Sequence, residues 1–268
     1  MPTVASVFGG NLCDTLWVTP LARYVSDLTV WMRGDDVKAR AVAPILDGVC
    51  SVLLEPNPPE TRKAPIHAHV TQQILSAYGF NGKPSVPRVV LTFDEIQWAI
   101  EYLRPYGQKR VALVAHCSGS GDPTNYRAHY VQGSVEDMVQ IAKFWKGAGY
   151  TVLQFGPAQN YYTKDIFTPF EGCIQIRGLT VRQLAACYYV IGKLISVDTG
   201  DQWLMLAVGG RAAVLVPPHS DQLGYRHWDL HLNSICWGDE RPRVDYIPQG
   251  DWWRGMNTKL FTDIGGAL

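Results

Sequence analysis

Short apolar runs alternate with amphipathic stretches along most of the chain, and these two patterns predict strands and helices respectively. The strands are predicted at residues 3–8, 28–32, 48–54, 110–115, 150–155, 193–197 and 212–216. The helices are predicted at residues 14–25, 37–46, 69–78, 94–103, 135–147, 181–189 and 202–208. Because strands that alternate with helices are typical of a parallel sheet with both faces covered, the predicted fold class is α/β.

Two parts of the chain each begin with an apolar strand that runs into a loop of small residues. The first loop is Gly9–Asn11, and the second is Ser118–Gly121. This repetition predicts two Rossmann-like parallel-sheet domains that face each other across a cleft, over residues 1–107 and 108–245. The tail at 246–268 is aromatic and amphipathic, which predicts a helix that packs back on the body.

The composition is that of a globular protein. The 268 residues are 47% hydrophobic, which is enough to bury a core, and 24 Lys and Arg balance 24 Asp and Glu. A chain without net charge has no overall positive field for a polyphosphate backbone, which disfavours nucleic acid as a partner. No apolar run approaches the ~18 residues of a membrane span, so we expect a soluble, cytoplasmic protein. The six cysteines are scattered without zinc spacing, which indicates reduced core thiols.

Ligands of doubly wound sheets bind beyond the carboxyl ends of the strands, so the loops at those ends are candidate sites. Asp14 begins the first predicted helix, either as a carboxylate that faces the cleft or as a helix cap. The loop at 118–121 either lends backbone N–H groups to a phosphate or is a plain turn. The turn Asp198–Gly200 ends a strand and opens a helix, so its amides and the Thr199 hydroxyl either bind an anion or cap the helix.

Several common catalytic motifs are missing from the sequence. Neither G-x-G-x-x-G nor G-x-x-x-x-G-K-[ST] occurs, which disfavours a classical dinucleotide dehydrogenase and a P-loop NTPase. The G-x-S-x-G motif is missing too, which disfavours an ordinary α/β-hydrolase.

Four segments resemble motifs of the ADP-heptose:lipopolysaccharide heptosyltransferases, which form glycosyltransferase family 9. The segment Gly9–Leu21 resembles the N-terminal motif, in which a Gly-Asp pair is followed by apolar residues, Thr and Pro. The stretch 178–200 resembles the donor-site segment, which contains an Asp-[Ser/Thr]-Gly turn. Ala115–Ser118 and Gln154–Gly156 are similar to the first two loops of the family's C-terminal domain. The resemblance covers residues 3–218 in the right order and spacing.

The resemblance implies a GT-B fold and a metal-independent glycosyltransferase. Such an enzyme moves a sugar from a nucleotide-diphosphate sugar, which is a donor substrate and not a cofactor, to a hydroxyl of a glycan, lipid-linked saccharide or other acceptor. Asp14 falls on the family's catalytic aspartate and would act as the general base. The resemblance places the donor at Ser118, Gly119, Ser120, Arg127, Phe155, Gly156, Asp198, Thr199, Gly200 and Asp201, and the loop near the base at Gly9, Gly10 and Asn11.

Three positions depart from the family pattern. Cys13 stands where Gly usually precedes the catalytic Asp, and Trp203 stands where His usually follows the Asp-Thr-Gly turn. Arg127 is the nearest candidate for the family's basic residue in the first C-terminal loop, and the alternative is a solvated surface residue. Two other functions therefore stay open: a catalytically degenerate GT-B protein that binds a nucleotide or a glycan, and a glycosyltransferase that acts on modified DNA bases.

Overall fold

The structure is a computed structural model that describes residues 4–7, 12–57, 79, 86–114, 135–156, 170–197, 199–216 and 244–248. Some predictions therefore lie outside the described residues. These are the helices at 69–78 and in the tail, the loop residues Gly9, Gly10 and Asn11, and the donor residues Ser118, Gly119, Ser120, Arg127 and Asp198. The domain bounds at 1–107, 108–245 and 246–268 stay predictions.

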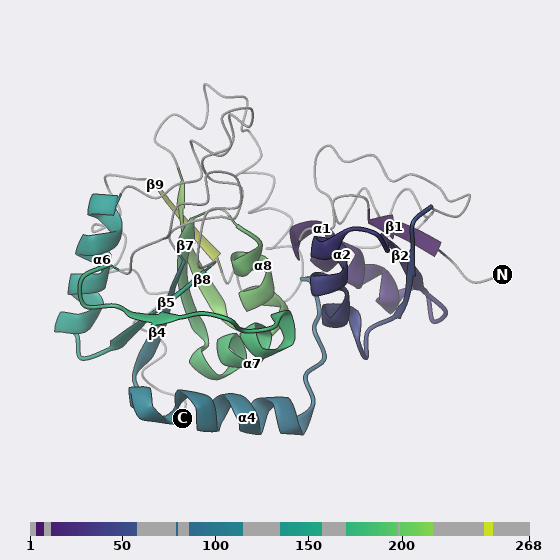
Figure 1. The fold of residues 1–268 in the computed structure, drawn as a ribbon. Coiled ribbons are helices and arrows are strands. Elements are labelled where there is room, and N and C mark those ends of the chain that lie inside the picture. Colours follow the sequence, from purple (N-terminus) through teal and green to yellow (C-terminus); the bar gives the residue numbers. More distant parts are fainter. Residues whose placement is uncertain are drawn as a thin grey trace.

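The first part of the chain forms a three-stranded parallel sheet, which we call the small unit (Figure 1). Its strands, in spatial order, are β1 (Val4–Val7), β2 (Thr29–Arg33) and β3 (Ser51–Glu55). Its helices are α1 (Leu12–Val18) and α2 (Val37–Val42), followed by the 3-10 helices η1 (Thr19–Arg23) and η2 (Ala43–Leu46). The three predicted strands of this region are confirmed.

Prolines explain why the helices of the small unit are shorter than predicted. Pro20 and Pro44 each lie at the start of a 3-10 helix that directly follows an α-helix. Proline has no N–H for the helical ladder, and its ring clashes with the carbonyl four residues earlier. The predicted helices at 14–25 and 37–46 are therefore each an α-helix that continues as a 3-10 helix.

The second part of the chain forms a six-stranded parallel sheet, which we call the large unit. Its spatial order is β6-β5-β4-β7-β8-β9. The strands are β4 (Arg110–Val114), β5 (Thr151–Phe155), β6 (Ile174–Ile176), β7 (Lys193–Val197), β8 (Arg211–Val216) and β9 (Val244–Pro248). The helices are α4 (Phe93–Leu103), α6 (Val135–Gly147), α7 (Val181–Ile191) and α8 (Gly200–Ala207), and a 3-10 helix, η3 (Arg104–Tyr106), follows α4.

Helices cover both faces of the large sheet, as the alternation predicted. Ile195 and Val197 of β7 pack with Met138 of α6, whereas Leu194 belongs to a cluster with Tyr188 of α7 and residues of α8. The cluster that contains Leu194 and Tyr188 continues into β2 and α1, so one apolar core joins the two units. No helix in the described part of the chain is both long enough and apolar enough to cross a membrane.

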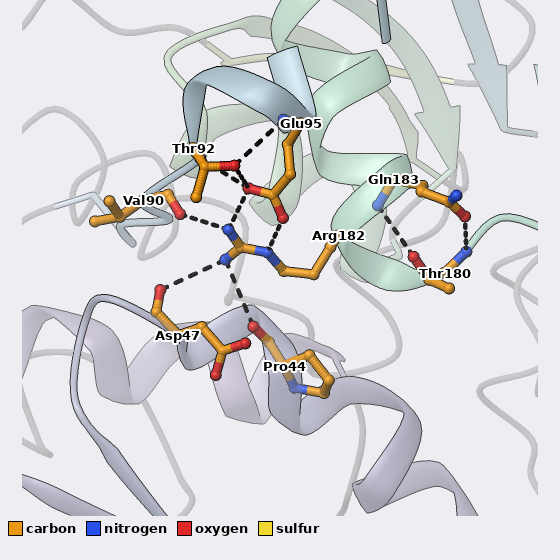
Figure 2. Close-up of polar contacts among 8 residues, drawn as sticks. All are labelled: Pro44, Asp47, Val90, Thr92, Glu95, Thr180, Arg182 and Gln183. Carbon is orange, nitrogen blue, oxygen red and sulfur yellow. Dashed lines mark hydrogen bonds and ion pairs between the residues drawn. The ribbon is translucent and has the colours of Figure 1, made fainter. Parts of the chain in front are cut away.

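A polar contact also joins the two units at the N-terminal end of α7, where the Arg182 side chain is only 12% exposed (Figure 2). Its Nε and Nη2 atoms donate to the two carboxylate oxygens of Glu95 at 2.6 and 2.5 Å. Nη2 also donates to Val90 O at 2.8 Å, and Nη1 lies 3.5 Å from the carbonyl oxygens of Pro44 and Asp47 in the small unit. One guanidinium therefore contacts α4, the segment before α4, and η2 with the residue after it.

Candidate functional site

The first turns of α1 and α8 lie against each other, although they are far apart in the sequence. A Cβ atom placed on Gly200 would lie 2.9 Å from the Leu12 Cβ atom and 3.2 Å from its Cδ2 atom. Both distances are shorter than an ordinary contact between carbon atoms, so the Gly200 backbone touches the Leu12 side chain directly. Further along the same helices, the Trp17 and Trp203 rings meet edge to face with centroids 5.6 Å apart. The contact joins the two helices that the resemblance connects with the base and with the donor.

Asp14 lies in the first turn of α1 and is half-buried. The buried residues Thr15 and Leu16 follow it and anchor this turn in the core. The helix dipole favours a carboxylate at this end of a helix, so the position suits a stabilising charge as well as a base held in a fixed place. Asp14 is therefore on the turn of α1 that contacts α8.

The Thr-Pro pair that follows α1 has a structural role near this contact. The Thr19 hydroxyl accepts a hydrogen bond from Arg88 N–H at 2.8 Å. The next amide, Val89 N–H, donates to Ala207 O at the end of α8 at 3.3 Å. The segment before α4 is thus hydrogen-bonded to the first residue of η1, directly after α1, and to the last residue of α8. This bridge links the two helices a second time.

Thr199 is the N-cap residue of α8. Its hydroxyl accepts from Asp201 N–H at 3.2 Å and donates to Asp201 Oδ2 at 3.1 Å. The other carboxylate oxygen, Oδ1, accepts from the Tyr188 hydroxyl at 2.7 Å. Desolvation raises the pKa of the Asp201 carboxyl above its usual range, and the two hydroxyl donors oppose that rise. The turn is therefore a helix cap, and both oxygens of Asp201 accept hydrogen bonds from protein hydroxyl groups.

Tyr188 connects two of the segments that the resemblance assigns to the donor. Its ring meets the Phe155 ring edge to face, with centroids 5.2 Å apart, and its hydroxyl reaches Asp201. Phe155 is the last residue of β5, and Gly156 follows it with a φ of 142° that L side chains rarely adopt. Sequence reasoning missed Tyr188. A tyrosine on the apolar side of a helix was the available signal. A buried phenol needs a hydrogen-bond partner, so its position indicates a polar group close by.

The two unusual residues on α1 and α8 both have packing roles. Trp203 is 4% exposed and contacts Trp17, so the position that holds His in the family pattern is filled by an aromatic contact between the helices. Cys13 is half-buried and packs against the main apolar cluster.

The described cysteines are Cys13, Cys50, Cys173 and Cys187, and none of them is in a disulfide. Cys187 is buried like a core thiol, whereas the other three are half-buried. Burial raises the pKa of the Cys50 and Cys187 thiols to about 12 and that of Cys173 to about 11. These three thiols therefore stay protonated at neutral pH and are poor nucleophiles. Within the described residues, no three His, Cys, Asp or Glu side chains are grouped in a way that could hold a metal ion.

Two parallel sheets, each packed with helices, define an α/β protein. The chain is similar to the crystal structure of a glycosyltransferase family 9 protein from Veillonella parvula, with a TM-score of 0.57 at 11% identity over 95% of this chain and 88% of that one. It is also similar to the ADP-heptose lipopolysaccharide heptosyltransferase II of E. coli, with a TM-score of 0.57 at 13% identity over 92% and 90% of the two chains. The family resemblance is thus confirmed in structure over most of the chain.

A third similar structure is the iron-containing dodecameric glycosyltransferase TibC of enterotoxigenic E. coli. Its TM-score is 0.58 at 14% identity, and the match covers 80% of this chain and 58% of TibC. No protein-family model and no curated protein matches the sequence. At identities this low, the likeness establishes the fold.

Proposed function

We propose that the protein is a glycosyltransferase that moves a sugar from a nucleotide-diphosphate sugar to an acceptor hydroxyl. The observation that supports this most is the contact between the first turns of α1 and α8, where Leu12 packs on Gly200. That contact brings the helix of Asp14 next to the Thr199–Gly200 turn. The GT-B-like structures with a family 9 or heptosyltransferase description support the same reaction class.

In the proposed reaction, Asp14 accepts the proton of the acceptor hydroxyl while the hydroxyl oxygen attacks the anomeric carbon of the donor. The bond from that carbon to the diphosphate breaks, and the bonding electrons leave with the diphosphate. The amide end of α8, at Gly200, favours the negative charge that develops on the leaving group. Ser118, Gly119, Ser120, Arg127, Phe155, Gly156 and Asp198 are the further donor contacts that we propose, and Gly9, Gly10 and Asn11 form the loop near the base.

Asp14→Asn tests the proposed base. A thermal-shift screen of nucleoside diphosphates and their sugars first identifies the donor, because a ligand of the native state raises its stability. Release of nucleoside diphosphate in the presence of saccharide acceptors then measures turnover. We expect Asp14→Asn to lower turnover by roughly 10²-fold or more and to leave donor affinity unchanged.

Asp94→Asn is the matched control, because Asp94 also lies in the first turn of a helix but is exposed on α4. Its turnover should equal that of the wild type. An Asp14→Asn enzyme that turns over at the Asp94→Asn rate would exclude Asp14 as the base.

One observation favours a second function, which is binding without turnover. Trp203 is buried against Trp17 at the position that holds His in the family pattern, so that side chain is not available to a donor. A protein that binds a nucleoside diphosphate but releases none from any nucleotide sugar would support this reading. Salt-dependent binding of DNA with hydroxymethylated bases would instead support a glycosyltransferase that acts on DNA.

Metal independence and a cytoplasmic location are also parts of the proposal. TibC is described as iron-containing, so a related fold can hold a metal. Turnover in excess EDTA, followed by addition of Mg²⁺, Mn²⁺ or Fe²⁺, tests this part. We expect full activity in EDTA, and activity that only a metal restores would overturn it.

A further inference from the structure

The Asp201 carboxylate is held on both sides by groups of the large unit. Tyr188 donates to Oδ1 from α7, and Thr199 donates to Oδ2 from the cap of α8. The Asp201 amide returns a hydrogen bond to the Thr199 hydroxyl. Tyr188, Asp201 and Thr199 thus form one connected chain of hydrogen bonds at the first turn of α8.

The tyrosine at the start of this chain has a fixed position of its own. Tyr188 has no exposed surface, and its ring rests on Phe155 at the end of β5. Burial raises the pKa of the Tyr188 hydroxyl well above its usual value, so the phenol remains a hydrogen-bond donor at all physiological pH values. The neighbouring Tyr189 lies on the same helix but is 49% exposed.

We infer that Tyr188 and Asp201 are positioning residues, which hold the Thr199–Gly200 turn in the shape that receives the diphosphate of the donor. This inference rests on the proposed function. It changes the role of Asp201 from a donor contact to a residue that acts through Thr199. It also adds Tyr188, which lies between the end of β5 and the first turn of α8.

The physical reason is preorganisation of the turn. A helix N-terminus stabilises an anion only when its amides already point at the place where the charge develops. Asp201 is itself negative, so a carboxylate released toward the ligand would repel a diphosphate. The Tyr188 hydroxyl holds this carboxylate toward α7, and the Leu12 side chain lies against Gly200 and limits its movement.

Tyr188→Phe tests the inference, because phenylalanine keeps the ring against Phe155 and removes only the hydroxyl. The probe is ADP, UDP or GDP, whichever binds the wild type best in calorimetry well below the melting temperature. We expect Tyr188→Phe to weaken binding by about tenfold at unchanged stoichiometry, which is the effect of one lost hydrogen bond to a charged group. A purely structural role would lower stability or stoichiometry and leave the dissociation constant unchanged.

Tyr189→Phe is the matched control and should bind like the wild type. Equal dissociation constants for Tyr188→Phe, Tyr189→Phe and the wild type would overturn the inference. A wild type that binds none of the three nucleotides would instead overturn the proposed function.

Asp201→Asn keeps the test decisive if Tyr188→Phe does not fold. The asparagine oxygen can still accept from Tyr188, but its NH₂ group cannot accept from the Thr199 hydroxyl. The turn should loosen, and nucleotide binding should weaken. If Asp201 only repels the ligand, removal of its charge should tighten binding, and tighter binding would overturn the inference.

Discussion

Two contacts of opposite character join the small unit to the large one. The contact between α1 and α8 is apolar, with Leu12 on Gly200 and Trp17 on Trp203. The contact at Arg182 is polar, and one guanidinium donates to a carboxylate and approaches three carbonyl oxygens. Apolar packing depends on close approach but has little directional preference, whereas a planar guanidinium has fixed donor directions. The apolar contact therefore sets how closely α1 and α8 approach each other, and the polar contact sets the orientation of α7.

Arg182→Met should give the largest loss of stability. The methionine fills part of the space but leaves the Glu95 carboxylate and three carbonyl groups without the guanidinium. Breaking a fully buried ion pair costs about 3–5 kcal/mol. Because Glu95 is 26% exposed, we expect a smaller loss, about 2 kcal/mol, in urea denaturation.

Arg104→Met is the control for that loss. Arg104, the first residue of η3, pairs with Glu101 of α4, and both side chains are more than half exposed. The control should lose no more than about 0.5 kcal/mol. Equal losses in the two variants would show that the Arg182 contact is no stronger than a surface ion pair.

Gly200→Ala should break the apolar contact with a somewhat smaller effect. Alanine usually stabilises a helix relative to glycine, by up to about 1 kcal/mol. At Gly200 the new Cβ atom would meet Leu12 at 2.9 Å, so we expect overpacking to destabilise the protein by about 1–2 kcal/mol. Thermal or urea denaturation of the variant measures the effect.

Gly147→Ala is the matched control, because Gly147 is also helical and has no atom within 4 Å of a built Cβ. Alanine there should stabilise the protein or leave it unchanged. Adding Leu12→Ala to Gly200→Ala should not restore the lost stability, because alanine keeps the Cβ atom that lies 2.9 Å from the new one. If Gly200→Ala instead stabilises the protein like the control, the two helices are not in close contact.

The strands that the sequence predicts correctly are those whose own residues form an apolar run. Strands β4, β5, β7 and β8 are apolar runs in the middle of the sheet, where both faces are covered. The sequence did not reveal β6 or β9, which lie at the two edges. Ile174–Ile176 is only three residues long with a central glutamine, and Val244–Pro248 contains Asp245 and ends in proline, so neither has the pattern of a buried strand.

The places of Asp14 and of the Thr199–Gly200 turn at the starts of two helices were predictable from the sequence, but their contacts were not, and their roles stay predictions. Asp14 and the Thr199–Gly200 turn were found because local motifs carry them. The inward direction of the Asp201 carboxylate depends on Tyr188, which belongs to another helix. The packing of Trp203 on Trp17 depends on how the two units meet. Such long-range contacts leave no periodic signal in a single sequence.

Capping boxes begin both α4 and α7, and only the one on α4 includes a residue that binds Arg182. Thr92 with Glu95 begins α4, and Thr180 with Gln183 begins α7. Replacing either threonine with alanine should cost about 1 kcal/mol. Thr92→Ala should cost more than Thr180→Ala, because Glu95 also binds Arg182 whereas Gln183 exchanges hydrogen bonds with Thr180 in its own cap. In the Arg182→Met background the difference in unfolding free energy should disappear, and a difference that persists would show that the cap and the ion pair are independent.

The smallest effects concern pH, and they have opposite signs in the two regions. Arg182 lowers the pKa of the Glu95 carboxyl, chiefly through its hydrogen bonds, so the unfolded state takes up a proton first as the solution is acidified. The stability that Glu95 adds is therefore present above the ordinary glutamate pKa of about 4.3 and is lost as the pH falls through the lower folded-state pKa.

Desolvation raises the pKa of Asp201, so the folded state binds the proton first and gains stability as the pH falls through the raised value. Urea denaturation between about pH 3 and pH 6 should show that Glu95→Gln reduces the loss of stability in acid and that Asp201→Asn increases it. If both variants change the pH dependence of stability in the same direction, the pKa values of Glu95 and Asp201 are not shifted in opposite directions.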